Sequence, residues 1–338
     1  MGKREKPIQN DNMPVSLSNG RSSHLLTGFY VVLFLFTTFV LLFEFVIPHG
    51  GYYVSDPTTT TTTLIITTGS GDAITSSDTE TTKTSTLAYP GELANVLKTG
   101  NVIGTYETDS LLLTIYQIRV SHSDIYVADV VVSDAHEILT ALAYNTFGGT
   151  NIVQTVSTMA ENHNAIFAVN SDYASHYDTG YVIRNGEILR QSASYRDAIV
   201  LYDDGYVDTF AESSVSINTV LDDGAWQLWS FGPVLVKDGL SVADVNDGLD
   251  RDRVDNPRTA FGMVDTNHFM FVCVDGRTTE SQGVDIEELA DIMMSIGCTV
   301  AYNFDGGGSS TMWFDGSVIN VPSQEEERAV SDCVYIAR

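Results

Sequence analysis

The sequence has few basic residues for its size. Its 338 residues include 17 lysines and arginines against 44 aspartates and glutamates, which gives a formal net charge of −27. A nucleic-acid backbone is held by clustered Lys and Arg side chains. The composition therefore argues against a nucleic-acid partner, and an anionic substrate would have to meet a few locally placed arginines.

Cysteine is also scarce. The three cysteines, Cys273, Cys298 and Cys333, allow one disulfide with one thiol left over, and their pairing stays open at this point. Each lies in an apolar stretch, and free cysteine is among the most buried residue types. Three buried thiols are therefore favoured over a bridge.

No cofactor or metal motif is evident. The acidic segment 244–256, DVNDGLDRDRVDN, suggests calcium, but its glycine stands one position early for an EF-hand loop. A solvated loop is therefore favoured, and neither a metal nor a cofactor is predicted.

One apolar run is long enough to cross a bilayer. Residues 25–43 carry no charge, and the apolar character continues to residue 47. A hydrocarbon core of about 30 Å needs roughly 20 such residues as a helix. Basic residues are concentrated upstream, between positions 3 and 21, so the positive-inside rule places the N-terminus in the cytoplasm. The alternative, a cleaved signal peptide, usually has a shorter apolar region that ends in small residues.

These features predict four parts. Residues 1–24 are expected to form a cytoplasmic tail, residues 25–47 a transmembrane signal-anchor, and residues 48–87 a disordered linker rich in Thr and Ser. That linker has too few large apolar residues to pack a core. Residues 88–338 are expected to form one extracytoplasmic domain.

The domain is predicted to have an α+β fold with a large mixed or antiparallel sheet and few helices. Helical spacing is found at 151–163 and at 285–297, and turn signals at 184–187, 203–205 and 237–239 indicate hairpins. The predicted strands are β-branched or apolar runs, and they cover residues 111–120, 124–132, 165–170, 268–275, 299–304 and 330–338.

A glycine-rich turn interrupts two apolar runs. The stretch NFDGGGSSTMWF places a carboxylate, Asp305, at the end of a predicted strand. Glycines there can adopt conformations closed to other residues, and they allow a ligand to approach the backbone. A glycine-rich turn alone is equally consistent with a plain hairpin loop.

Further segments carry a resemblance. The order of NSDYASHYDTGYVIRNGEI (170–188), SFGPVLVKDG (230–239), NPRTAFGMVDTNHFMFVCVDGR (256–277), SQGVDIEELADIMMSIGCTVAYNFDGGGSSTMWFDG (281–316) and NVPSQEEERAVSD (320–332) resembles the phosphodiester glycosidase family, which has lysosomal and bacterial exopolysaccharide-associated members. The resemblance is strongest over residues 155–338. NSDYA and Cys298 depart from the usual family pattern.

The resemblance implies hydrolysis of a sugar-1-phosphodiester. Cleavage of a glycosidic bond needs carboxylates near the anomeric carbon, and the catalytic candidates are Asp172, Asp275 and Asp305, whose individual roles stay open. Phosphate leaves readily, so cationic and backbone donors that hold it matter more than a strong general acid. The substrate-binding candidates are Asn170, Arg258, Arg277, Gly306, Gly307, Gly308, Ser309 and Ser310. Asn320 and Arg328 also fit the family pattern.

Structural explanations compete with these roles. Residues 275–277 could form a hairpin turn with an internal ion pair, and Arg258 could pair with the acids of residues 247–255. Glu288 lies three residues after Asp285 at a helix start, which is the spacing of a capping box. A serine nucleophile is disfavoured, because GGSST is not the G-x-S-x-G nucleophile elbow.

The sequence therefore predicts a hydrolase, a glycosidase that cleaves sugar-1-phosphodiesters in cell-surface glycans or polysaccharides. It would be anchored in the cell membrane by a single pass through the lipid bilayer, with the catalytic domain outside. One alternative is a non-catalytic module of the same fold that binds glycans or assists envelope or exopolysaccharide assembly. A second is a phosphoesterase that cuts on the phosphorus side. The hypothesis requires Asp305, Arg258 and Arg277 to meet in one pocket.

Overall fold

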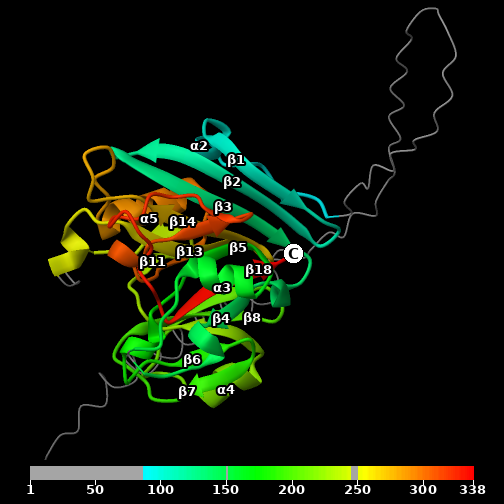
Figure 1. Ribbon diagram of the computed structural model, residues 1–338. Coiled ribbons are helices and arrows are strands. Elements are labelled where there is room, and N and C mark those ends of the chain that lie inside the picture. Colours follow the sequence, from blue (N-terminus) through cyan, green and yellow to red (C-terminus); the bar gives the residue numbers. More distant parts are fainter. Residues whose placement is uncertain (1–86, 150, 245–249) are drawn as a thin grey trace, which may run out of the picture. The chain divides into compact units, whose positions relative to one another are not determined.

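The computed structural model describes residues 87–149, 151–244 and 250–338, which belong to one compact unit (Figure 1). The predicted cytoplasmic tail and signal-anchor lie outside the described residues, and so does the predicted linker up to residue 86. Residues 245–249 of the acidic segment also lie outside them. None of the helices within the described ranges has the length and apolar character needed to span a bilayer.

Three antiparallel sheets form this unit. The first has eight strands, in the spatial order β1 (Asn101–Glu107), β2 (Leu111–Val120), β3 (Ser123–Val132), β14 (His268–Val274), β13 (Arg258–Asp265), β15 (Val300–Asn303), β11 (Val234–Lys237) and β12 (Leu240–Ser241). The second has the order β7 (Glu187–Arg190), β6 (Val182–Arg184), β10 (Ala225–Trp229), β8 (Asp197–Tyr202) and β9 (Val207–Ala211). The third has the order β17 (Ser317–Val318), β16 (Met312–Phe314), β5 (Ala165–Asn170), β18 (Asp332–Ala337) and β4 (Leu139–Leu142).

The helices are short and few. The described α-helices are α2 (Asn95–Lys98), α3 (Val156–Asn162), α4 (Ile217–Asp222) and α5 (Ile286–Ser295). Single 3₁₀ turns are η1 (Ala135–Glu137), η2 (Ala143–Asn145), η3 (Ala174–His176), η4 (Asp250–Arg253) and η5 (Gly307–Ser309). The prediction of an α+β fold dominated by strands is confirmed. The single large sheet is corrected to one large and two smaller sheets, all antiparallel among the described residues.

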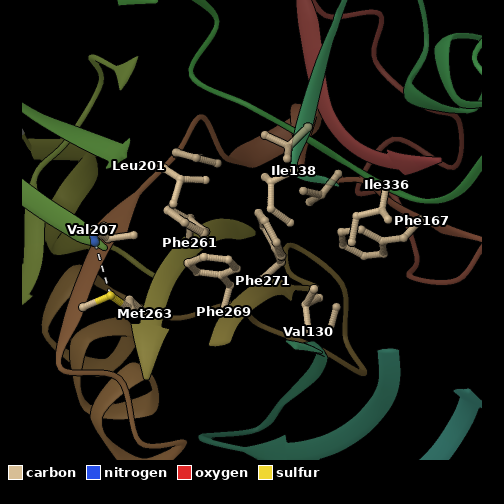
Figure 2. Close-up of a cluster of buried hydrophobic side chains, with 14 of the residues drawn as sticks. Val130, Ile138, Phe167, Leu201, Val207, Phe261, Met263, Phe269, Phe271 and Ile336 are labelled. Carbon is tan, nitrogen blue, oxygen red and sulfur yellow. Dashed lines mark hydrogen bonds between the residues drawn. The ribbon is translucent and has the colours of Figure 1, made fainter. Parts of the chain in front are cut away.

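The main core lies where the three sheets meet. Phe261, Phe269 and Phe271 of the eight-stranded sheet pack against one another, with Phe261 lying 5.0 Å from Phe271 and 5.8 Å from Phe269 between ring centroids. Figure 2 shows these rings between Leu201 of the second sheet and Phe167 of the third. Removal of such apolar surface from water is the dominant favourable term in folding, and the core is close-packed.

Each sheet has a helix on its other face. α5 and α2 cover the eight-stranded sheet, α4 packs on the second sheet, and α3 packs on the third. α5 begins with a capping box, because the Asp285 carboxylate accepts from the Glu288 amide at 2.8 Å and the Glu288 carboxylate accepts from the Asp285 amide at 3.3 Å. The structural interpretation of Glu288 is confirmed.

The six predicted strands and both helices are found, but α3 begins at Val156, five residues after the predicted start, and Gln154 pairs instead with Val330 in a β-bridge. The hairpin prediction at 184–187 is explained by Asn185 and Gly186, whose φ angles of +51° and +76° suit the turn that connects twisted strands. β13 is the main strand that the pattern does not predict, since Gly262 interrupts its apolar run. A β-carbon at Gly262 would lie 2.8 Å from the Cys298 sulfur, so the glycine permits close packing there.

The cysteines are free and buried, as predicted. Cys273 lies in the core between the sheets, Cys298 in the core under α5, and Cys333 in the core beside α3. Burial raises the pKa of all three thiols, so they behave as small apolar side chains.

Candidate active site

The glycine-rich turn connects two different sheets. β15, which ends at Asn303, pairs with β13 in the eight-stranded sheet, whereas β16, which begins at Met312, pairs with β5 in the third sheet. The hairpin interpretation of this turn is therefore wrong. Residues 304–311 form a crossover at the junction of two sheets.

Backbone geometry and close approach explain the three glycines. Gly307 has a φ of +64°, a conformation that L side chains rarely adopt. A β-carbon on Gly306 would lie 2.7 Å from the carbonyl oxygen of Pro257, which is too close. A β-carbon on Gly307 would lie 3.1 Å from Nη2 of Arg277, and one on Gly308 would overlap the guanidinium group of Arg328. Two arginine side chains thus lie against residues 306–308 of the turn, which have no side chains.

A cavity of about 180 Å³ opens over this turn. Its lining residues are Phe231, Asp252, Asn256, Arg258, Arg277, Asn303, Asp305, Gly306, Gly307, Gly308 and Arg328. The structure therefore brings together six of the predicted site residues. It adds a third arginine and a second carboxylate.

The three arginines differ in how their donors are used. Arg258 is 5% exposed and donates from Nε to the Val284 carbonyl at 3.0 Å and from Nη2 to the Val254 carbonyl at 3.0 Å. Its Nη1 lies 4.0 Å from a carboxylate oxygen of Asp252. Part of its function is therefore to hold the acidic loop, as the structural interpretation expects.

Arg277 and Arg328 are more available to a ligand. Both are exposed. Arg277 donates from Nε and Nη2 to the side-chain oxygen of Asn256 at 3.1 and 2.8 Å, which leaves Nη1 for another acceptor. Arg328 makes no hydrogen bond or ion pair with any residue in the described ranges. A guanidinium group can bind a phosphate through two parallel hydrogen bonds, so the pair presents an anion-binding face beside Asp305.

Asn170 lies behind the turn instead of lining the cavity. Its side-chain amide donates to the Asp305 carbonyl at 2.6 Å, and its side-chain oxygen accepts from Thr259 Oγ1 at 2.9 Å and from the Thr311 amide at 3.1 Å. Asn170 is fully buried. It therefore joins both sheets to the turn that carries Asp305.

Asp172 is enclosed away from the cavity. Its carboxylate accepts from Nη2 of Arg184 at 2.6 Å and from the Ser230 amide at 2.9 Å, and Nε of Arg184 donates to Asp332 at 3.0 Å. Asp172 and Asp332 are each exposed by 1% or less and Arg184 by 3%. The catalytic role predicted for Asp172 stays a prediction, and its surroundings are those of a buried ionic network.

Asp275 is linked to the turn through Asn320. It is 3% exposed and accepts from the side-chain amide of Asn320 at 3.1 Å and from the Val321 amide at 3.0 Å. Asn320 also donates to the Ser310 carbonyl at 3.1 Å. Burial raises the pKa of Asp275 to about 6, and the hydrogen bonds from Asn320 and Val321 oppose this rise. Asp275 is not among the lining residues of the cavity.

The backbone and serine candidates are mostly occupied or buried. The Gly307 amide donates to the Pro257 carbonyl at 2.8 Å, so it is not free to hold a phosphate. Ser309 and Ser310 are 1% and 2% exposed and do not line the cavity. Within the described residues, no group of three or more His, Cys, Asp or Glu side chains is arranged to hold a metal ion.

Sequence reasoning did not include several lining residues among its principal candidates. Arg328 fits the family pattern, but nothing local shows that it reaches Gly308, 20 positions earlier. Asn303 ends β15 and is 2% exposed, and its side-chain oxygen finds no hydrogen-bond partner among the described residues. Buried polar atoms are normally paired, which makes this oxygen a candidate ligand contact. Phe231 supplies an aromatic edge to the cavity.

The fold and this site correspond to a known family of proteins. A family model for phosphodiester glycosidases matches residues 163–337, a range that includes every residue that lines the cavity. The chain belongs to the phosphodiester glycosidase family.

One curated protein is similar to this chain in sequence. The chain is 32% identical over 204 residues to the SPbeta prophage-derived uncharacterized protein YomE of Bacillus subtilis (strain 168), a match that covers 56% of this chain and 30% of that protein. The chain thus spans less than a third of the length of this curated relative.

Two solved structures share the fold. The catalytic domain of zebrafish N-acetylglucosamine-1-phosphodiester alpha-N-acetylglucosaminidase, auto-inhibited by its pro-peptide, matches with a TM-score of 0.54 and 21% identity, over 73% of this chain and 87% of that one. A hypothetical protein from Synechocystis matches with a TM-score of 0.52 and 13% identity, over 68% and 63% of the two chains.

Proposed function

We propose that this protein is a membrane-anchored glycosidase that hydrolyses the bond between the anomeric carbon of a sugar and a phosphodiester. The observation that carries the proposal is the meeting of Asp305 with Arg277 and Arg328 at one cavity over the glycine turn. Membership of the phosphodiester glycosidase family supports it.

The proposed chemistry needs only one well-placed carboxylate. Asp305 accepts a proton from water as the water oxygen attacks the anomeric carbon, and the bond from that carbon to the phosphate oxygen breaks. The leaving phosphate carries its electron pair away as a monoester, and the guanidinium groups stabilise its charge. A phosphate needs little protonation to leave, so the second carboxylate of ordinary glycosidases is less important here.

The size of the cavity agrees with a small reacting group. About 180 Å³ is below the roughly 300–1,000 Å³ of pockets for drug-sized ligands. A cavity of this size takes only a small reacting group, so the rest of a glycan or polysaccharide would lie outside.

Turnover of sugar-1-phosphodiesters tests the proposal. Wild-type protein should release free sugar from a UDP-sugar or from an ester of N-acetylglucosamine-1-phosphate, and Asp305→Asn and Arg277→Gln should each reduce kcat/KM at least about a hundredfold. Arg338→Gln is the matched control, because Arg338 pairs with Asp315 on the surface, outside the cavity. Glycan binding without any turnover in the wild type would favour the non-catalytic module.

The position of bond cleavage is tested with heavy-oxygen water. The proposed reaction places the heavy oxygen in the released sugar. Heavy oxygen in the phosphate would show cleavage on the phosphorus side and would replace the glycosidase by a phosphoesterase.

The membrane location rests on residues 25–47 of the sequence. We propose that they anchor the chain with the domain outside the cell. Protease added to intact cells should then degrade the domain, and replacing residues 25–47 with a cleavable secretion signal should release it into the medium. Resistance of the domain until the cells are lysed would place it inside.

A further inference from the structure

Aromatic side chains form a continuous row that begins at the cavity. Phe231 lines the cavity, and its ring centroid lies 6.5 Å from that of Tyr177. The ring of Tyr177 lies 5.5 Å from that of His176, and His176 stacks on Tyr173 at 4.8 Å with only 10° between the ring planes. We call these four residues the aromatic row.

The row is accessible over most of its length. His176 is exposed, while Phe231, Tyr177 and Tyr173 are partly exposed. The guanidinium group of Arg196 lies over the Tyr177 ring, 4.0 Å from its centroid, so it covers one face of that ring and brings hydrogen-bond donors beside the row. Partly exposed aromatic side chains combine an apolar ring with a polar tip and are enriched at interaction sites.

The loop that carries the row is held rigidly. Arg190 donates to the carbonyl oxygens of Ala174, at 2.7 Å, and of Tyr177 and Gly180. The preceding residue of the loop, Asp172, is fixed by the buried Arg184.

Tyr173 itself has a strained backbone. Its φ of +57° and ψ of +39° lie in the left-handed region, which is unusual for a bulky residue. Such strain persists only where the surrounding structure enforces it and is concentrated at binding and catalytic sites. The ring of Tyr173 is thus held in a defined place at the cost of local strain.

We infer that the aromatic row binds a saccharide unit that lies beyond the phosphate of the substrate. This inference rests on the proposed function and specifies its substrate as an extended glycan, not a simple sugar phosphate. A sugar ring presents flat faces of C–H groups and a rim of hydroxyls. The flat sugar face matches the ring face of Tyr173 or His176 that the other ring of this stacked pair leaves uncovered. The hydroxyls can accept hydrogen bonds from Arg196 beside Tyr177.

Continuity with the cavity selects this occupant. Phe231 lines the cavity and is also part of the aromatic row. A glycan that extends out of the cavity past Phe231 would therefore contact Tyr177 next. The cavity of about 180 Å³ is too small for more than the reacting group, so the remaining units must contact the outer surface. Binding energy from such remote contacts raises catalytic efficiency when it positions the reacting bond.

Paired substrates test the inference. One probe joins N-acetylglucosamine-1-phosphate to a disaccharide, and the other joins it to a methyl group. In Tyr173→Ala and in His176→Ala, the ratio of kcat/KM for the disaccharide ester to that for the methyl ester should fall roughly five- to tenfold. Tyr206→Ala is the control, because Tyr206 is an exposed tyrosine in the turn between β8 and β9 and should leave the ratio unchanged.

Binding separates this inference from the proposed function. Calorimetric titration of Asp305→Asn protein with the disaccharide ester should show the same five- to tenfold loss when Tyr173→Ala or His176→Ala is added. If the wild type hydrolyses neither ester, the proposed function fails, and the titration still decides whether the row binds saccharide.

Two results would overturn the inference. One is an affinity for the disaccharide ester that changes less than twofold in both folded variants, with folding verified by thermal melting. The other is a loss of affinity for a UDP-sugar without any loss for the disaccharide ester, which would assign the row to a nucleobase instead.

Discussion

The side-chain amide of Asn170 donates a hydrogen bond to the main-chain carbonyl of Asp305 at 2.6 Å, across 135 positions of sequence. Asn170 ends β5 of the third sheet, and Asp305 follows β15 of the eight-stranded sheet. The place of the proposed catalytic carboxylate is therefore set by contact between two sheets. Changes at this junction should affect stability and activity together.

Asn170→Asp should be strongly destabilising, although it only replaces the side-chain NH₂ group by an oxygen. Aspartate keeps the acceptor for Thr259 and Thr311 but turns an oxygen toward the carbonyls of Ser171 and Asp305. Burying an unpaired and charged acceptor should cost about 3 kcal/mol in the free energy of unfolding. Urea titration measures this cost. Asn101→Asp, at an exposed position of β1, should change stability by less than about 0.5 kcal/mol, and equal losses in the two variants would refute the prediction.

Gly308→Ala should act through Arg328. Its β-carbon would overlap the Arg328 guanidinium group, while the φ of Gly308 lies outside the left-handed region. The variant should therefore fold normally, displace Arg328, and reduce kcat/KM by roughly ten- to a hundredfold, as expected for loss of a charge-assisted hydrogen bond.

The double variant with Arg328→Ala checks that mechanism. If Gly308→Ala acts only by moving Arg328, the double variant should be no slower than Arg328→Ala alone. Gly316→Ala is the contrast, because Gly316 has a φ of +92° and open space around it. It should lower stability and leave kcat/KM unchanged. Additive losses in the double variant would show that Gly308 contributes in another way.

Asp275 should make stability depend on pH in the mildly acidic range. Its pKa is raised from 3.8 to about 6 by burial. Between these values the folded protein retains a proton that the unfolded chain has released, so the free energy of unfolding falls as the pH rises. A shift of about two units corresponds to about 3 kcal/mol.

Asp275→Asn should remove this dependence. Stability of the variant relative to wild type should increase by about 3 kcal/mol between about pH 4 and pH 7, because asparagine keeps an oxygen for Asn320 and Val321 and has no charge to bury. Unfolding curves across that range give the measurement. If the unfolding free energies of wild type and variant change with pH in parallel, the prediction is wrong. Loss of turnover in a variant with unchanged structure would assign Asp275 a chemical role.

The buried network of Asp172, Arg184 and Asp332 should depend most on its single cation. Arg184→Met leaves two buried carboxylates unpaired and should cost about 3–5 kcal/mol in the free energy of unfolding. Asp332→Asn leaves one matched pair and should cost about 1–2 kcal/mol. Arg119→Met is the surface control, because Arg119 and Asp124 are 52% and 29% exposed as side chains, and it should cost about 1 kcal/mol or less. Chemical denaturation measures the loss of unfolding free energy in the three variants. A larger loss in Arg119→Met than in Arg184→Met would show that the buried network contributes little to stability.

Much of the fold could be predicted because its signals are local. β2, β5 and β14 follow from runs of β-branched and aromatic residues, and α5 follows from its spacing and from the Asp285 cap. The turn at Asn185 follows from a residue pair that tolerates positive φ. Each depends on interactions within a few positions of the chain, which periodicity and turn chemistry describe.

The candidate site could be predicted only in part. Asp305, Arg258, Arg277 and the glycines were indicated by family motifs, and the cavity contains all of them. Asp172 was indicated by the same kind of motif, yet it lies in a buried network with Arg184. A motif shows that a residue type matters and does not show whether the side chain faces a ligand or the interior.

By itself, the sequence determined most of the strand and helix segments, the burial of the cysteines, and the presence of a glycine turn after Asp305. Only the tertiary structure decided that β15 and β16 belong to different sheets, that Arg328 lies over Gly308, and that Phe231 continues into the row toward Tyr173. The physical reason is that local conformation depends on torsional preferences and neighbouring side chains. The partners of a polar group across many residues depend instead on how whole sheets pack together.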